Sequence, residues 1–123
     1  MLLNDFFTIR DTVSSATEIW AELVINANHK IFEGHFPNQP VVPGVCMMQM
    51  IKEIVEEVIG KKTNLVRAAD MKFLAVISPV ENNLIHASIK MIDENGTVNI
   101  VASFFKDELV HFKCKAKLLV SGH

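Results

Sequence analysis

Hydrophobic and polar residues alternate along several segments of the 123-residue chain, and this period of two predicts β-strands with one buried face. From residue 17 to residue 27, apolar side chains recur at every second position. The same pattern is clearest near the C-terminus, where His111 and three lysines separate the apolar residues. The positions expected to face the core in these two strands are Ile19, Ala21, Leu23, Ile25, Ala27, Val110, Phe112, Cys114, Ala116 and Leu118.

Further segments are also predicted to be strands, and one pair of them forms a hairpin. The candidates are residues 6–13, 65–77, 84–92 and 97–105. The first alternates least regularly, and a Ser-Pro pair stops the long second one. Between the last two lies Asp93-Glu94-Asn95-Gly96, and an Asn-Gly pair tolerates the positive φ that tight hairpins need. These two segments are therefore expected to pair in an antiparallel arrangement.

A helical period replaces the alternation between residues 47 and 59, and it predicts one helix of roughly 15 residues. The apolar face is expected to consist of Met47, Met50, Ile51, Ile54, Val55, Val58 and Ile59. The opposite, solvated face is expected to consist of Gln49, Lys52, Glu53, Glu56 and Glu57. Pro43 suits the first turn, where its missing N–H costs nothing. Gly60 suits the end, because glycine adopts the left-handed conformation that often closes a helix.

The order of these elements predicts an α+β fold in a single domain, residues 1–123. Two strands precede the helix and four follow it. Consecutive hairpins imply an antiparallel sheet, and the apolar helix needs cover from that sheet. Half of the residues are hydrophobic, which is enough for a core at this length.

Composition and charge argue against several classes of function. The formal net charge is -2, so no basic footprint indicates nucleic-acid binding. No apolar run is long enough to span a membrane, and the first residues lack the basic start of a signal peptide. Cys46 and Cys114 lie far apart and match no metal-binding spacing. We therefore expect a cytoplasmic protein with free thiols, no metal site and no membrane insertion.

The most unusual stretch is GHFPNQPVVPG, residues 34–44, which contains three prolines and a single histidine. Each proline fixes φ at about −65°, so this backbone is expected to be rigid. The stretch leads directly into the predicted helix, whose first N–H groups have no intrahelical partners and can hold a carbonyl oxygen. His35 lies just upstream. A titratable imidazole beside free N–H donors suits proton transfer.

This stretch resembles the signature of the hot-dog-fold 3-hydroxyacyl-acyl-carrier-protein dehydratases. That family has Gly-His-Phe-Pro-Gly-x-Pro, two further residues, Pro-Gly and then a helix, and the spacing here is the same. The predicted order of elements over the whole chain is also similar. The resemblance implies a hot-dog fold, in which a curved six-stranded antiparallel sheet wraps around one central helix. It also implies a fatty-acid or polyketide type of pathway.

The resemblance implies a role for each motif residue. His35 would take the proton from C2 of a 3-hydroxyacyl thioester, and the Gly44 N–H would polarise the thioester carbonyl. An acid on the first helical turns would protonate the leaving hydroxyl, and a dimer would combine the histidine of one subunit with the acid of the other. Further substrate contacts are expected from Phe36, Pro43, Val45 and Cys46. No cofactor is implied, because the substrate is carried on the phosphopantetheine of an acyl carrier protein.

The acid position is where the sequence departs from the family. Gln49 stands where the family has Glu or Asp, and an amide cannot donate a proton as a carboxylic acid does. Many of these dehydratases carry a glutamine four residues after the acid, whereas here Glu53 follows Gln49. Glu53 lies one turn further along, about 5 Å by helix pitch, so we expect a solvated residue rather than an alternative acid. Asn38 is a second departure, at a position that is usually glycine.

Three functions are consistent with this pattern. The leading hypothesis is a dehydratase-like homodimer or higher homo-oligomer with slow turnover, in which His35 is the base and Gln49 orients the hydroxyl or a water. A second is a non-catalytic carrier-binding protein, or a partner subunit in a heterodimer with an active paralogue. A third is a hot-dog thioesterase, which would depend on the Glu53 carboxylate.

The remaining reactive side chains are expected to have ordinary roles. His86 and His111 fall on the polar side of their strands, and Cys114 falls on the apolar side. Cys46 is expected to line the acyl tunnel. The cationic residues that could dock an acidic carrier protein are Lys61, Lys62, Arg67 and Lys72.

Overall fold

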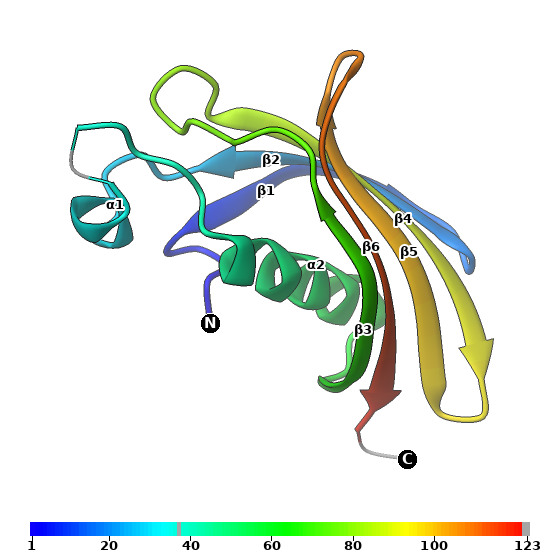
Figure 1. The fold of residues 1–123 in the computed structure, drawn as a ribbon. Coiled ribbons are helices and arrows are strands. Elements are labelled where there is room, and N and C mark those ends of the chain that lie inside the picture. The colour runs from blue at the N-terminus through cyan, green and yellow to red at the C-terminus, as the bar shows by residue number, and fades with distance from the viewer. Residues whose placement is uncertain (37, 122–123) are drawn as a thin grey trace.

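The computed structural model describes residues 1–36 and 38–121, and its strands form one antiparallel sheet in the order β1-β2-β4-β5-β6-β3 (Figure 1). The strands are β1 Phe7–Ser14, β2 Glu18–Ile25, β3 Thr63–Phe73, β4 Leu84–Glu94, β5 Thr97–Lys106 and β6 Leu109–Val120. The helices are α1 Ile31–Gly34 and α2 Gly44–Ile59. β1 and β3 form the two edges of the sheet.

The core lies between α2 and the inner face of the curved sheet (Figure 1). The helix residues with no exposed surface are Met50, Ile51, Ile54 and Val55. The predicted inward residues of β2 are buried as well: Ile19, Ala21, Leu23 and Ile25. Each large aliphatic side chain buried in this way contributes about 1.5–3 kcal/mol to folding. The predicted architecture, one long helix covered by a six-stranded antiparallel sheet, is confirmed.

Local signals determine the ends of α2 and the β4–β5 hairpin, as predicted. Pro43 is the N-cap residue of α2, one position before the first turn in which it was predicted, and Gly60 closes the helix in the left-handed conformation at φ 71°. The Gly60 N–H donates to the carbonyl oxygen of Glu56. Between β4 and β5, Asn95 and Gly96 have φ of 49° and 87°. Positive φ at both positions is the geometry that an Asn-Gly hairpin favours.

The segment predicted as one long strand, residues 65–77, is divided at Phe73, where β3 ends. The regular pairing with β6 ends at Phe73 and Phe112, and the last residue of the segment has a different backbone partner. Val42, which lies just before α2, donates its N–H to the carbonyl oxygen of Ile77 at 2.9 Å. The end of this segment, at Ile77, is therefore attached to the stretch that contains His35, whereas Leu74 and Ala75 still donate their N–H groups to the His111 carbonyl oxygen of β6. The short helix α1 is a further element that no periodicity predicted.

The predicted solvated face of α2 is wrong for Glu53 and Glu56, which are 1% and 7% exposed. Glu56 accepts hydrogen bonds from the N–H and hydroxyl of Thr63, at 2.6 and 3.1 Å, and from Lys52 Nζ at 3.0 Å. Burial alone would raise the pKa of Glu56, but the hydrogen bonds from Thr63 and Lys52 outweigh it and leave the pKa below its usual value. The carboxylate thereby attaches the last turns of α2 to the start of β3.

Replacing Glu56 with glutamine should lower the free energy of unfolding by about 1–2 kcal/mol at neutral pH, because a charge-assisted hydrogen-bond acceptor is lost. The folded-state pKa of Glu56 lies below the unfolded value. Its contribution is therefore complete above the unfolded pKa and is lost as the pH falls through the folded one. Urea titrations at pH 7 and pH 3 should show the variant and wild type converging. Glu57→Gln, at an exposed site, is the control, and a difference that persists unchanged at pH 3 would contradict this account.

Candidate active site

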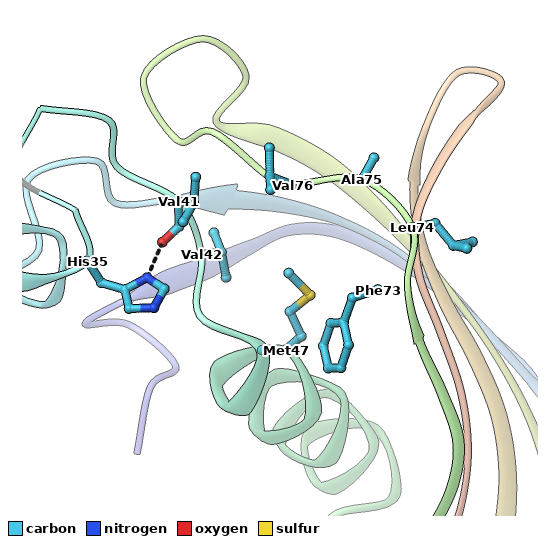
Figure 2. A pocket seen from close by; sticks show the side chains of 9 residues that line it. His35, Val41, Val42, Met47, Phe73, Leu74, Ala75 and Val76 are labelled. Carbon is cyan, nitrogen blue, oxygen red and sulfur yellow. Dashed lines mark hydrogen bonds between the residues drawn. The ribbon is translucent and has the colours of Figure 1, made fainter.

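His35 lies where α1 ends and the chain turns towards α2, and its half-buried ring is held by the loop that follows (Figure 2). The ring Nδ1 is 3.4 Å from the carbonyl oxygen of Val41, and the Val41 N–H donates to the His35 carbonyl oxygen at 3.1 Å. A carbonyl oxygen can only accept, so Nδ1 carries the hydrogen in this pair. Nε2 is then left with a free lone pair. The loop therefore presents the imidazole as a base through Nε2.

His35 lines a pocket of about 420 Å³ at the start of α2. Figure 2 shows His35 on one side of it and Phe73 and Met47 on the other. The lining residues are His35, Val41, Val42, Gly44, Met47, Phe73, Leu74, Ala75 and Val76. His35 carries the one titratable side chain in this set, and the other walls are apolar or backbone. Such a pocket suits an apolar ligand with one reactive centre, as an acyl thioester is.

Gly44, the first residue of α2, provides both a donor and the space to reach it. Cys46 and Met47 donate their N–H groups to the carbonyl oxygen of Pro43, at 3.0 and 3.3 Å. The Gly44 N–H has no hydrogen-bond acceptor among residues 1–36 and 38–121, as expected for the first residue of a helix. A Cβ at Gly44 would lie 2.8 Å from Cε1 of Phe73. Glycine therefore allows the aromatic ring to approach the helix start, where the free N–H is located.

Gln49 lies one turn into α2, and its amide is bound to Glu53. The Gln49 Nε2 donates to Glu53 Oε2 at 2.7 Å. The same carboxylate accepts the N–H groups of Leu2, at 2.9 Å to each oxygen, and of Leu3, at 2.7 Å. Because a carboxylate can only accept, the NH₂ of Gln49 must face Glu53 and its Oε1 must face away. Among the described residues, the set that lines the pocket does not include Gln49.

The expectation that Glu53 is solvated is therefore wrong. The N-terminal residues fold back over α2 and satisfy its carboxylate, and Glu53 is 1% exposed. Every hydrogen bond that it makes comes from an N–H donor. Glu53 thus acts as an anchor for the Gln49 amide and for the chain at Leu2 and Leu3. Its carboxylate is not directed at the pocket of His35.

Comparison with known families tests the relationship to dehydratases that residues 34–44 indicate. A family model described as ApeI-like, ApeI dehydratase, matches residues 11–116. The chain belongs to the ApeI-like dehydratase family. The matched part includes His35, Gly44 and Gln49, so the family covers the whole candidate site. The predicted relationship to hot-dog dehydratases is confirmed.

Relatives and a solved structure agree with membership of the ApeI-like dehydratase family. The 3-hydroxyacyl-[acyl-carrier-protein] dehydratase FabZ of Pediococcus pentosaceus is 26% identical over 106 residues, 80% of this chain and 70% of that protein. FabZ of Lactiplantibacillus plantarum is 29% identical over 86 residues, 63% of this chain but only 58% of that protein. A structure of the dehydratase heterocomplex ApeI:P from Xenorhabdus doucetiae has a TM-score of 0.73 at 19% identity, and covers 90% of this chain and 96% of that one. This likeness confirms the hot-dog fold.

The other predicted substrate contacts lie around the start of α2 in different environments. Phe36 is exposed and its ring stacks on His35 with the ring centres 4.4 Å apart. Val45 is 80% exposed, whereas Pro43 is buried. Cys46 is buried and is not among the described residues that line the pocket, and burial raises the pKa of its thiol. Their predicted contact with substrate stays a prediction.

The exposure of His86, Cys114 and His111 in this ApeI-like family member tests three further predictions. His86 lies partly exposed beside Trp20, as its polar position predicts. Cys114 is a core residue, and burial raises the pKa of its thiol to about 11. The prediction for His111 is wrong, because this residue is 3% exposed. No helix in the part of the chain that the structure describes is long and apolar enough to cross a bilayer.

Proposed function

We propose that the chain is a subunit of a dehydratase that acts on 3-hydroxyacyl thioesters carried by an acyl carrier protein. The observation that carries the proposal is the arrangement at the start of α2. There the Val41 carbonyl favours the His35 tautomer with its hydrogen on Nδ1, and the Gly44 N–H, which has no acceptor among the described residues, lies beside the same apolar pocket. Membership of the ApeI-like dehydratase family supports the reaction type.

In the proposed reaction, His35 Nε2 takes a proton from C2 of the bound thioester. The Gly44 N–H donates to the thioester carbonyl oxygen, which stabilises the negative charge that develops there. The electron pair from the C2–H bond forms the C2–C3 double bond as the C3–O bond breaks. The hydroxyl leaves as water, with its proton supplied by the His35 imidazolium, either directly or relayed through a water that the Gln49 amide orients. The products are an enoyl thioester and one water molecule.

We propose that a second subunit completes the site. Gln49 does not line the pocket of its own chain among the described residues, and β3, whose last residue is Phe73, is an edge strand. Leu65 and Val66 on this edge are 44% and 57% exposed, although both are apolar. Pairing of two copies along β3 would cover these side chains and bring new residues to the pocket mouth. The exposed cationic residues proposed to receive the acyl carrier protein are Lys61, Lys62, Arg67 and Lys72.

A partner-subunit role is the second candidate, and the contact between Gln49 and Glu53 favours it. The amide at the acid position is bound to a buried carboxylate, so this chain supplies the base but no acid at position 49. The related solved structure from Xenorhabdus doucetiae is itself a heterocomplex. A thioesterase role is less well supported, because the Glu53 carboxylate that it needs is buried and already holds Leu2 and Leu3.

The test is an assay of the purified wild-type chain with a 3-hydroxyacyl-pantetheine thioester. Enoyl thioester should form at a kcat on the order of 0.1 s⁻¹ or less, since a typical enzyme turns over at about 10 s⁻¹ and a missing general acid costs about 100-fold or more. The absorbance of the conjugated enoyl thioester measures dehydration. A thiol reagent measures the free thiol that thioester hydrolysis would release. Release of free thiol without enoyl product would contradict the dehydratase proposal. Turnover only after addition of a second hot-dog subunit that carries an acid would assign the partner role instead.

A further inference from the structure

Part of the pocket wall is backbone that belongs to no strand. It consists of Leu74, Ala75 and Val76, which follow β3 and are called the wall segment below (Figure 2). Leu74 and Val76 are 54% and 67% exposed. Apolar packing therefore does little to fix this segment, and its position depends on its backbone hydrogen bonds.

His111 of β6 makes the hydrogen bonds that hold the wall segment. The N–H groups of Leu74 and Ala75 donate to the His111 carbonyl oxygen, at 2.9 and 3.2 Å. The His111 side chain makes the complementary contacts. Its Nδ1 lies 3.3 Å from the carbonyl oxygen of Ala75 and 3.1 Å from that of Val76. His111 thus bonds the N–H groups of Leu74 and Ala75 and the carbonyl oxygens of Ala75 and Val76.

The imidazole of His111 works through one of its two nitrogens. Both partners of Nδ1 are carbonyl oxygens, so Nδ1 carries the hydrogen and is shared between them. Nε2 then has a bare lone pair, and this buried atom has no partner among the described residues. An unsatisfied buried nitrogen is unfavourable, because it loses its hydrogen bonds to water and gains none within the protein. An apolar residue would fill the same space without burying an unsatisfied nitrogen. The Nδ1–H donor therefore explains why a histidine occupies this position.

A break in the β5–β6 pairing turns the ring toward the wall. Phe105 pairs with Val110 and Phe104 pairs with Phe112, so His111 is the extra residue of a β-bulge. A bulge re-aims the side chain of its extra residue. As a result, His111 and Phe112 are both buried although they are adjacent in the strand.

We propose that His111 is a positioning residue that fixes the wall segment and thereby sets the fit of the pocket to the acyl part of its ligand. Phe73 directly precedes the wall, and its ring lies against Gly44. Movement of the wall segment would therefore shift the Phe73 ring beside the Gly44 N–H, and it would also shift the apolar lining of the pocket. The identity of the ligand rests on the proposed function, whereas the fixing of the wall by His111 does not.

The experiment compares His111→Leu with His111→Asn. Leucine fills the space without a donor, and asparagine can place an N–H near the position of Nδ1. His86→Leu, which removes an imidazole from the outer face of the sheet, is the control. Amide hydrogen exchange of Leu74 and Ala75 is measured in each variant. Binding of a saturated acyl-pantetheine thioester, which cannot be dehydrated, is measured by calorimetry.

Exchange at Leu74 and Ala75 should be about tenfold faster in His111→Leu and nearly unchanged in His111→Asn and the control, with the amides of β4 and β5 unaffected. The dissociation constant for the acyl thioester should rise about tenfold in His111→Leu and be restored in His111→Asn. Unchanged exchange at the wall, or equal acceleration throughout the sheet, would overturn the positioning role. Unchanged affinity, or no binding by the wild type, would overturn the link to the ligand. Neither hydrogen exchange nor ligand binding requires turnover. The proposal for His111 and the dehydratase proposal can therefore fail independently of each other.

Discussion

The His35→Ala variant should lose enoyl-thioester formation by about a thousandfold while remaining folded, because removal of a general base costs about 100- to 10,000-fold in rate. In the proposed reaction His35 is the one group of the pocket that can accept the C2 proton. Gly44, Met47 and Phe73 of the lining offer no titratable group. The substrate should still bind, since the apolar walls and the Gly44 N–H remain. The loss should therefore appear in kcat more than in KM.

The fold should tolerate this change, which makes the kinetic result interpretable. The side chain of His35 makes one long hydrogen bond, 3.4 Å to the Val41 carbonyl oxygen, and stacks on the exposed ring of Phe36. We expect a change in the free energy of unfolding within about 1 kcal/mol. His86→Ala is the matched control, because this histidine lies on β4 and is not among the described residues that line the pocket. Turnover by His35→Ala above about a tenth of the wild-type rate would show that another group is the base.

Local sequence signals account for the parts of the fold that could be predicted. Pro43 and Gly60 mark the ends of α2 because their own backbone preferences favour those conformations. Asn95 and Gly96 specify the hairpin turn in the same way. Alternation identified the core face of β2, since a strand side chain that points inward must be apolar unless it finds a partner. Each of these predictions needs only neighbouring residues.

The wrong predictions for Glu53 and His111 concern polar residues whose partners are distant in sequence. Glu53 is buried because the N–H groups of Leu2 and Leu3, about fifty residues earlier, satisfy its carboxylate. No periodicity within the helix contains that information. His111 is buried because a bulge shifts the register of β6, and a shift of one residue moves a side chain to the other face. Of the candidate site, the motif indicated His35 and Gly44, but the anchoring of Gln49 required the tertiary structure.

Exchanging the two residues in the double variant Gln49→Glu, Glu53→Gln should raise the dehydration rate about 10- to 100-fold above wild type. The wild-type pair is an amide and a carboxylate joined at 2.7 Å. After the exchange, the amide at position 53 can accept the N–H groups of Leu2 and Leu3 through its oxygen and donate its NH₂ to the carboxylate at position 49. All partners then keep a hydrogen bond, so the fold should be retained. A carboxyl group now occupies the family's acid position and can supply the proton that the leaving hydroxyl needs.

The single variant Gln49→Glu should behave differently, because it places two carboxylates at hydrogen-bonding distance beside buried Glu53. Two such groups cannot both ionise, so the pair should retain a proton at a pH where an isolated glutamic acid has lost it. A folded-state pKa above the unfolded value gives stability that is complete below the unfolded pKa, about 4.3, and lost as the pH rises through the folded one. Relative to wild type, this variant should therefore be more stable at pH 5 than at pH 8. The double variant has a single carboxyl group in the pair, so its stability should depend less on pH.

A complete cycle of wild type, Gln49→Glu, Glu53→Gln and the double variant separates acid chemistry from anchoring. Glu53→Gln keeps a hydrogen-bonding group at position 53 but adds no acid at position 49, so its rate should not exceed that of wild type. A gain confined to variants with a carboxyl group at position 49 would assign this position to proton transfer. If the folded double variant is no faster than Glu53→Gln, position 49 is not where the leaving hydroxyl lies. The chain's Gln49 would then be an anchoring residue of α2, and the acid of the reaction would have to come from a partner subunit.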